Sequence, residues 1–545
     1  MKKIGLYILS LGMMFSSCQD WLDINHDPNN ATKDKISKEL LLSGMQNYMN
    51  RYQISSSFHS TLAHYTSKSG SYSGNYVILT GIMTPQDGDS FWQSTYNYIA
   101  NLKAIKEKAI EEQDAACEGI ATILMVQNYQ RLVDVFNNIP YTESALGGEN
   151  VTPKYDKAPD IYNDLILKCD EAAGLISKAI SDPGSISPQL KKADIMCKGN
   201  MEQWLRYTNT IKLTLLMRIS NVQDVSAQVA ALQDKCLAID ELVEANPGYY
   251  KETSKMNPLY EIWGYNSMDN QIQRNKEYKP TTSLVDFLRD NADPRLRVYI
   301  SPRASIGNPN DGTADYSKYG LADEYYVGVP YGWLNPPTHG YISSVGLGIL
   351  ARSSSRVEGP LQPLVVRTGA EVGFFLAEAA LRGMIPGGDA TAKDYYEKAV
   401  TASITRHEKA MKATDYPFEG MRDPIEGTAK EAAEAYLCQQ NPKINWSLMT
   451  SYEQKLEAIC TQKWLNLYMV DHLEAWSEYR RTDYPKMGRS VSSASTKNIS
   501  RFLYPQTERN MNFDNVNAEG EIDIHDSLIF WDKENNIAPE TEVYL

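Results

Sequence analysis

Residues 461–485 read TQKWLNLYMVDHLEAWSEYRRTDYP and form the most informative stretch of the chain. Large side chains recur in it at every fourth residue, which places them on one stripe of an α-helix. These side chains are Trp464, Tyr468, His472 and Trp476. Two arginines, Arg480 and Arg481, follow where the negative end of a helix dipole favours positive charge. The pattern predicts one core helix over residues 453–481, with hydrogen-bonded polar tips and no catalytic role.

The same helical spacing of apolar residues continues through most of the remaining chain, which predicts a mainly α fold. Pro159 and Pro183 bound one such helix, and prolines are typical of helix ends. The other predicted helices cover residues 91–111, 115–137, 204–219, 372–382, 391–411 and 427–439. The helix pairs within residues 115–180 and 372–411 resemble degenerate tetratricopeptide units, without a strict repeat period.

Two regions lack any sustained hydrophobic period. Residues 52–90 are rich in Ser, Gly and Tyr, and residues 245–365 contain many Pro, Gly, Asn and Tyr. Long loops on a rigid frame often carry function, and abundant aromatic residues argue against disorder. The chain has 35 Tyr against 11 Phe and 9 Trp. Because Tyr joins an apolar ring to a polar tip, this excess suggests a binding surface. We therefore expect a helical frame that presents aromatic-rich loops.

The composition excludes several classes of protein. With 54 Lys and Arg against 68 Asp and Glu, the chain of 545 residues has a formal charge of −14. Such a surface repels phosphate backbones, so nucleic-acid binding is not expected. The 42% hydrophobic and 22% charged residues are typical of a folded globular protein. Beyond residue 17, no apolar run approaches the ~18–20 residues that span a bilayer.

The N-terminus has the features of a secretory signal over residues 1–17. Lys2 and Lys3 precede an apolar run that ends at Phe15, and Ser16 and Ser17 stand directly before Cys18. Small residues before a cysteine suit lipoprotein signal peptidase, which predicts cleavage before Cys18 and lipid modification of its thiol. An ordinary secretory signal with an incidental cysteine is the alternative. Residues 18–545 are then expected to form a single domain.

Six further cysteines are too sparse and too widely spaced for a disulfide-rich scaffold or a zinc motif. Most of them stand among apolar neighbours, so we expect free core thiols with at most one or two disulfides.

Three motifs resemble functional sites only in part. Residues 346–351 match the G-x-G-x-x-A dinucleotide fingerprint but are not followed by a helical pattern. Residues 515–526 resemble a calcium loop but open with Asn and close with Asp, so a solvated acidic turn is favoured. His59 and His64 have the wrong spacing for a shared metal on one helix face. No cofactor or metal site is predicted.

Landmarks along nearly the whole chain resemble the SusD/RagB family of nutrient-binding outer-membrane lipoproteins of Bacteroidetes. They are CQDWLDIN at 18–25, DPNN at 27–30, FW at 91–92, DVFNNIPY at 134–141, GNMEQW at 199–204, NADPRL at 291–296 and the stretch at 461–485. The DPNN opening and the HLEAWSEYRRTDYP ending are similar to the SusD-like branch of the family.

This resemblance implies a SusD-like fold with tetratricopeptide-like helix pairs and a lipid anchor on the outer face of the outer membrane. It also implies a non-catalytic role, in which the protein captures a nutrient and delivers it to a SusC-like TonB-dependent transporter. The family takes up both glycans and peptides, and the sequence does not separate the two. A glycan is the main hypothesis and a peptide the alternative.

The ligand residues of the family lie in variable loops, so our candidates come from physical reasoning. Sugar rings stack on aromatic faces while polar side chains bind their hydroxyl groups. The candidates are Tyr72, Tyr76, Trp263, Tyr265, Tyr331 and Trp333, with Asn335 and His339 as polar neighbours. Two other functions stay open. One is a surface glycoside hydrolase that uses a loop carboxylate pair such as Asp87 and Asp89. The other is a scaffold that binds only the transporter.

Overall fold

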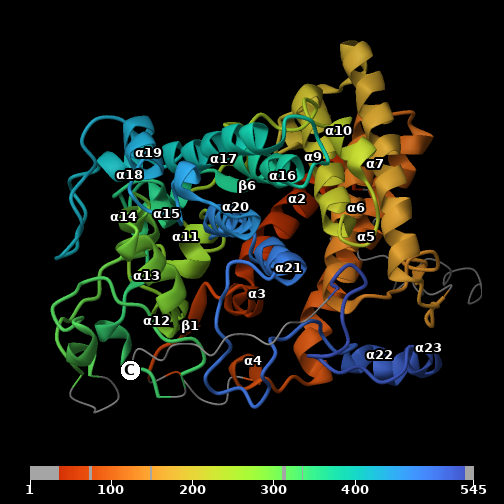
Figure 1. The fold of residues 1–545 in the computed structure, drawn as a ribbon. Coiled ribbons are helices and arrows are strands. Elements are labelled where there is room, and N and C mark those ends of the chain that lie inside the picture. The colour runs from red at the N-terminus through yellow and green to blue at the C-terminus, as the bar shows by residue number, and fades with distance from the viewer. Residues whose placement is uncertain are drawn as a thin grey trace, which may run out of the picture.

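The structure is a computed structural model that describes residues 36–70, 72, 77–147, 150–309, 315–333 and 335–533 (Figure 1). The predicted signal peptide, Cys18 and Tyr76 lie outside the described residues. Helices dominate the fold, as the sequence predicts.

The longer helices form the frame of the molecule. They are α2 (Lys38–Ser55), α5 (Asp89–Glu111), α6 (Ala115–Phe136), α7 (Ala158–Ser181), α9 (Met201–Ile219), α16 (Gly369–Leu381), α17 (Gly388–Thr405), α20 (Tyr452–Leu467) and α21 (His472–Thr482). Most begin at a residue whose side chain caps the first turn: the Asp114 carboxylate accepts from the Cys117 amide, and Ser451 and Gln454 form a capping box.

Shorter elements connect this frame. The short helices are α3 (Ser57–Leu62), α4 (Val77–Thr80), α8 (Pro188–Ala193), α10 (Ser226–Ala230), α11 (Pro258–Trp263), α12 (Gln273–Glu277), α13 (Thr282–Asp290), α14 (Leu296–Tyr299), α15 (Leu347–Ala351), α18 (Glu408–Lys412), α19 (Ala429–Leu437), α22 (Gln506–Met511) and α23 (Phe513–Ala518). Three antiparallel two-stranded sheets pair β1 (Thr66–Lys68) with β3 (Tyr278–Pro280), β2 (Leu242–Ala245) with β6 (Leu364–Thr368), and β4 (Ile300–Ser301) with β5 (Ser344–Val345).

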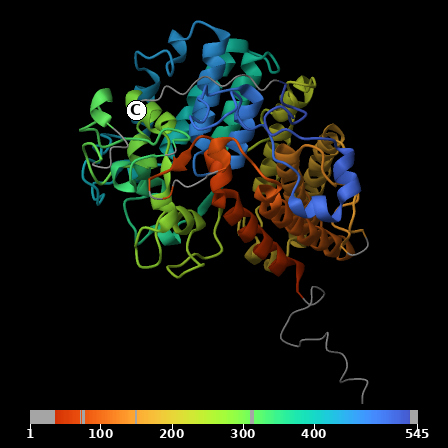
Figure 2. The same ribbon diagram turned by 90° about the horizontal axis from the view of Figure 1, so that it is seen from below.

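Neighbouring long helices pack in sequence order as helical hairpins. On one side of the molecule α5 packs on α6, α6 on α7, and α7 on α9. A second group joins α16 to α17 and to α20. These contacts confirm the predicted tetratricopeptide-like pairs within residues 115–180 and 372–411. Figures 1 and 2 show the first group on one side, the green segments with α11–α15 on the other, and α20–α21 between them.

The single helix predicted over residues 453–481 is wrong, because the structure has two helices there. α20 ends at Leu467, and Met469 has a left-handed φ of 56°. The Asp471 side chain then accepts from the Glu474 amide and begins α21. The predicted helix over residues 391–411 also divides, at Arg406 and His407, into α17 and α18.

The four-residue spacing does not indicate this break, because the aromatic side chains on both sides of it still pack together in the core. The ring of Tyr65 lies 5.0 Å from that of Trp464, 5.2 Å from Tyr468 and 5.6 Å from His472, measured between centroids. The burial that the pattern predicts is therefore correct, although the backbone is interrupted.

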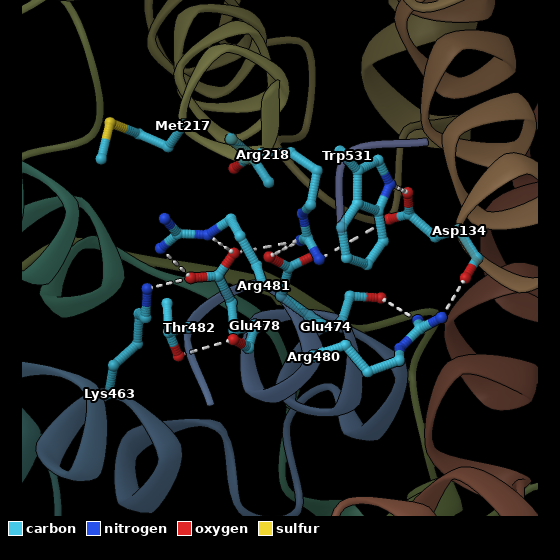
Figure 3. Close-up of polar contacts among 12 residues, drawn as sticks. Asp134, Met217, Arg218, Lys463, Glu474, Glu478, Arg480, Arg481, Thr482 and Trp531 are labelled. Carbon is cyan, nitrogen blue, oxygen red and sulfur yellow. Dashed lines mark hydrogen bonds and ion pairs between the residues drawn. The ribbon is translucent and has the colours of Figure 1, made fainter. Parts of the chain in front are cut away.

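A buried ionic network joins α21 to both helical groups (Figure 3). Arg218 of α9 donates to Glu474 and lies 3.4 Å from Glu478. Glu478 also pairs with Lys463 of α20 and, at 2.7 Å, with Arg481. Buried charges are costly unless they are paired in this way. The arginines and carboxylates of the 461–485 stretch thus have structural partners.

The buried guanidinium of Arg480 also has its hydrogen-bonding needs met by protein atoms. Its guanidinium lies 3.5 Å from the centroid of the Trp476 ring and donates to the carbonyl oxygens of Asp134 and Ser500 at 2.8 and 2.7 Å. These contacts agree with the prediction of hydrogen-bonded polar tips on a core helix.

Buried apolar side chains from Leu42 to Trp531 form one contiguous cluster. Among the described cysteines, five are buried, Cys438 is exposed, and all are free thiols. In the part of the chain that the structure describes, none of the helices has the length and apolarity needed to cross a bilayer.

Candidate functional site: an open groove beside the loop region

An open groove of about 1000 Å³ lies between α13 and α20, both labelled in Figure 1. Residues 441–443 and 485–488 also contribute to its wall. Ligand sites in proteins commonly occupy about 300–1,000 Å³, so the groove has room for an extended ligand.

One wall comes from the polar face of α13. Leu284, Val285 and Leu288 point into the core, while Ser283, Asp286, Phe287 and Asp290 line the groove. Spacings of three and four residues put such side chains on one face of a helix. The Thr281 hydroxyl caps the helix by accepting from the Leu284 amide at 3.4 Å.

The opposite wall comes from one face of α20. Gln454, Glu457, Thr461 and Trp464 recur along it at intervals of three and four residues. Trp464 is only 4% exposed, and its indole nitrogen donates to the Ala63 carbonyl at 2.8 Å, so it forms part of the floor. The helix thus joins the core on one side and the groove on the other.

The groove combines hydrogen-bonding groups with apolar surface. Its carboxylates are Asp286, Asp290 and Glu457, its amides Asn291, Asn441 and Gln454, and its ammonium groups Lys443 and Lys486. Phe287 and Met487 supply apolar surface. Carboxylates and amides can bind the hydroxyl groups of a sugar or the amides of a peptide, while the apolar surface can contact C–H groups.

Asp286 has an unusual environment for a carboxyl group. Burial, with a smaller effect from the nearby charges of Asp290 and Glu324, raises its pKa to about 6, although Arg289 opposes the shift. The Arg289 guanidinium lies 3.0 Å from the Asp286 carboxylate. Asp286 therefore changes its charge near pH 6, which makes it the most informative side chain of the groove.

The groove adjoins the loop region in which the sequence predicts the ligand site. The Thr282 amide donates to the Val329 carbonyl at 3.0 Å, so the 327–333 segment runs beside the start of α13. Residues 485–488 continue to Val491, whose amide donates to the Tyr331 carbonyl at 3.2 Å. Gly332 has a φ of +80°, and a Cβ there would lie 1.8 Å from the Ser490 hydroxyl oxygen.

Four of the predicted ligand residues lie in adjoining, accessible loops. The Gly70 amide donates to the Pro337 carbonyl at 2.7 Å, which brings the segment that carries Tyr72 beside residues 335–339. Tyr72, Trp333 and His339 are half-buried and Asn335 is exposed. Trp333 packs with Tyr341 against a small second apolar cluster of Tyr316 and Val327.

Three other predicted ligand residues are core residues. Trp263 is 0% exposed and its indole donates to the Ile54 carbonyl at 2.6 Å. The Arg356 guanidinium covers the Tyr265 ring at 4.6 Å, and the Tyr331 ring stacks on His64 at 3.9 Å. Because protein atoms already cover the faces of these rings, they offer no stacking surface to a ligand in this structure.

The two acids considered for hydrolysis have structural contacts. Asp87 accepts from the amide and hydroxyl of Thr84 at 2.7 and 2.8 Å, in a capping box. Asp89 accepts from the amide and hydroxyl of Thr507 at 3.2 and 2.9 Å. They therefore act as a cap and a tether in this structure.

The incomplete motifs also have structural explanations. Residues 347–351 form only the short α15, which follows an antiparallel strand rather than the parallel strand of a dinucleotide fold. In the acidic segment at 515–526, Asp523 accepts from the His525 and Asp526 amides and Asp526 pairs with Lys497. Among the described residues, no three His, Cys, Asp or Glu side chains gather as a metal site.

Sequence reasoning missed the groove residues of α13 and α20. Their signal was present in the alternation of Leu284, Val285 and Leu288 with Asp286 and Phe287, which marks an amphipathic helix. Such a pattern predicts only an ordinary surface helix. The groove forms because the polar face of α13 lies opposite one face of α20.

Solved structures share this fold. The chain resembles a chitin-binding protein, with a TM-score of 0.69 and 23% identity over 91% of this chain and 100% of the other. It also resembles a chitin-binding SusD homologue from Flavobacterium johnsoniae, with a TM-score of 0.69 and 21% identity over 91% and 98% of the two chains. A SusD homologue from Bacteroides fragilis gives a TM-score of 0.68 and 21% identity over 92% and 100%. No curated protein matches the chain.

These likenesses define the class as helical proteins with the SusD-like architecture. A sequence model of the SusD-like family, described as starch-binding and associating with the outer membrane, matches residues 28–505. The chain therefore belongs to the SusD-like family, and the resemblance drawn from its sequence landmarks is confirmed.

Proposed function

We propose that this protein is a surface lipoprotein that captures a glycan or oligosaccharide and delivers it to a SusC-like TonB-dependent transporter. The observation that carries the proposal is the groove of about 1000 Å³ between α13 and α20. It is open and lined by both polar and apolar groups, and its α13 wall is hydrogen-bonded at Thr282 to Val329 of the neighbouring loop. Membership of a family described as starch-binding and outer-membrane-associated supports the same role.

A glycan suits the groove because carboxylates and amides outnumber its ammonium groups, and sugar hydroxyls donate to such acceptors. Two proteins with the same fold are chitin-binding. Chitin oligomers and starch fragments are therefore the first ligands to test. A peptide is the alternative ligand for the same role, since peptide amides can use the same acceptors.

We infer the transporter partner from the family and the lipid anchor from the N-terminal sequence. Cleavage before Cys18 and lipid modification of its thiol would hold the protein on the outer membrane, facing outward, where a transporter could receive the ligand. Two or more acyl chains give durable anchoring, whereas one gives only marginal binding.

The test is a binding measurement on soluble protein that begins after Cys18. Starch fragments, chitin oligomers, other glycans and peptides are compared by calorimetry for the wild type, Phe287→Ala and Trp333→Ala. Tyr250→Ala is the matched control, because this aromatic is 45% exposed but does not line the groove. We expect selective binding to one class, weakened about tenfold or more by a groove or loop variant and unchanged in the control.

Binding that no groove or loop variant alters would overturn this location of the site. If no ligand binds, the scaffold role, in which the protein contacts only the transporter, replaces nutrient capture by the isolated chain.

A surface glycoside hydrolase is the second candidate, and Asp286 is the observation that favours it. A carboxyl group with a pKa near 6 beside other carboxylates is a feature of general acids in glycosidases. Incubation with the same glycans and detection of new reducing ends tests this role. Turnover that disappears in Asp286→Asn would establish catalysis, and its absence supports a binding protein.

A further inference from the structure

A second, much smaller cavity of about 30 Å³ adjoins the link between α20 and α21. Leu259, Ile349 and Leu350 provide apolar wall, and Met469 of the link lines it as well. The cationic and titratable side chains on the wall are Arg352, Arg406 and His407. The cavity can hold one water-sized or slightly larger particle, because a single water requires about 10–15 Å³.

Arg406 uses only part of its hydrogen-bonding capacity. Its Nε donates to His407 Nε2 at 2.9 Å, and its Nη2 donates to the Tyr299 hydroxyl at 3.2 Å and the Asn466 carbonyl at 2.9 Å. Its Nη1 is buried and has no protein acceptor. Two N–H groups of a buried guanidinium are therefore available to a ligand.

His407 carries a second unpartnered nitrogen. Because its Nε2 accepts from Arg406, the ring proton of the neutral imidazole is on Nδ1. The side chain is only 7% exposed, and Nδ1 has no hydrogen-bond partner among the protein atoms. Because the two ring nitrogens of an imidazole point away from each other, the Nδ1 proton points away from Arg406, and Arg406 Nη1 is the donor that the guanidinium offers to the cavity.

The electrostatic surroundings of this cavity are positive. Arg406 forms no ion pair with any carboxylate of the described chain, whereas Arg295 pairs with Asp293 at 2.6 Å and Arg352 pairs with Glu244. Burial and the charges of Arg406, Arg352 and Arg295 hold the pKa of His407 well below its usual range. A buried cation without a counter-ion is costly, and a buried donor without an acceptor adds to that cost.

We propose that this cavity is a binding site for one small inorganic anion of the halide class, chloride in particular, held by Arg406 Nη1. An anion supplies what the protein atoms do not, namely an acceptor for Nη1 and a counter-charge for the guanidinium. The small volume excludes carboxylate-bearing metabolites and phosphate esters. The site is independent of the groove, which shares none of these residues.

An anion at this position would stabilise the junction of three chain segments. Arg406 and His407 occupy the break between α17 and α18, Arg352 ends α15, and Met469 lies in the link between α20 and α21. Since a ligand that binds only the folded state stabilises it by mass action, thermal stability should depend on the identity of the anion.

The first experiment uses the wild-type soluble chain. Crystals grown in bromide in place of chloride are measured at the bromine absorption edge, and melting temperatures are recorded from 1 to 300 mM chloride, with sulfate or gluconate keeping the ionic strength constant. We expect an anomalous peak within hydrogen-bond reach of Arg406 Nη1. For a Kd of ~10 mM, we expect a rise in Tm of about 1–3 °C.

The second experiment compares Arg406→Gln with the matched control Arg297→Gln. Arg297 also carries buried nitrogens without a partner, Nε and Nη1, but it does not line this cavity. The chloride-dependent rise in Tm should disappear in Arg406→Gln and persist in Arg297→Gln. If Arg406→Gln does not fold, the bromide map of the wild type decides alone.

Water in place of the bromide peak, together with a Tm that is equal in all salts, would overturn the proposal. Bromide at surface positions only, with no peak in the cavity, would overturn it equally.

Discussion

Arg481 of α21 donates to both carboxylate oxygens of Glu378 of α16, at 2.7 and 2.6 Å, across 103 residues of sequence. Both side chains are 1% exposed. Lys463 of α20 lies 3.9 Å from the same carboxylate. This bidentate pair therefore holds α21, and with Lys463 also α20, which carries one wall of the groove, against the second group of helical hairpins.

The first prediction concerns this pair. Glu378→Gln keeps the shape of the side chain but removes its charge, which leaves Arg481 and Lys463 with less compensation in the core. Breaking a buried pair by removing one partner costs about 3–5 kcal/mol of unfolding free energy. Urea unfolding followed by circular dichroism measures the loss.

Glu397→Gln is the matched control for Glu378→Gln. Glu397 lies on α17 and forms an exposed pair with Lys393 at 3.7 Å, with the two side chains 41% and 40% exposed. Exposed pairs contribute less than about 1 kcal/mol, so this variant should unfold nearly as the wild type does. Equal losses in the two variants would contradict a special role for the buried pair.

The second prediction separates two tryptophans that the sequence treats alike. Trp263→Ala removes a fully buried ring and its hydrogen bond to Ile54, which should cost about 3–5 kcal/mol of stability. Trp333 is half-buried in the accessible loop cluster, so Trp333→Ala should lose less than half as much stability and affect ligand binding instead. Thermal unfolding and calorimetry on both variants check this. A stable Trp263→Ala that fails to bind ligand would reverse the assignment.

The contrast between Trp263 and Trp333 also shows how far sequence reasoning extends here. Both stand in aperiodic, aromatic-rich segments, and composition alone cannot tell a ring that secures a loop from one that meets a ligand. Burial depends on contacts over long sequence distances, such as the hydrogen bond from Trp263 to Ile54. Several long helices, in contrast, follow from local spacing, and the predicted bounds of α5, α6, α7, α9 and α16 lie within a few residues of those observed.

Local sequence patterns also could not predict the groove or the break before α21. The break at Met469 preserves the spacing of buried rings, so periodicity does not register it. The groove exists only because α13 and α20, some 170 residues apart in the chain, face each other with polar side chains. The polar face of either helix alone is an ordinary solvated surface.

The third prediction concerns acid stability and His64. Burial lowers the pKa of His64 to about 3, whereas an exposed histidine has a pKa near 6.5. Between these values the unfolded chain binds a proton that the folded chain excludes, so stability falls as the pH falls from about 6.5 towards 3. Above pH 6.5 both states are neutral at this residue and it adds no pH dependence.

His64→Phe tests this linkage while retaining a ring against Tyr331. The dependence of unfolding free energy on pH between 6 and 4 should become shallower by about 1.4 kcal/mol per pH unit, the contribution of one proton. Urea unfolding at several pH values measures it. The slope of the wild type also contains other buried histidines, including His59, so the comparison between the two proteins is the test. Identical slopes would show that His64 is protonated in the folded protein.

The fourth prediction rests on the proposed function and concerns the pH dependence of ligand binding. Because the pKa of Asp286 is raised to about 6, its carboxyl is mostly protonated at pH 5 and ionised at pH 7.5. An ionised carboxylate accepts a stronger hydrogen bond from a ligand hydroxyl or amide than a neutral carboxyl does, by about 1 kcal/mol. Binding should therefore be about fivefold tighter at pH 7.5 than at pH 5.

Asp286→Asn removes the titration and keeps the size of the side chain, so its affinity should be lower at pH 7.5 and nearly constant between pH 5 and 7.5. Calorimetry at both pH values measures this, with Asp290→Asn as the matched control. Asp290 lies on the same groove wall, one helical turn further along α13, but more exposed to solvent. If the wild type binds equally well at both pH values, Asp286 does not contact the ligand.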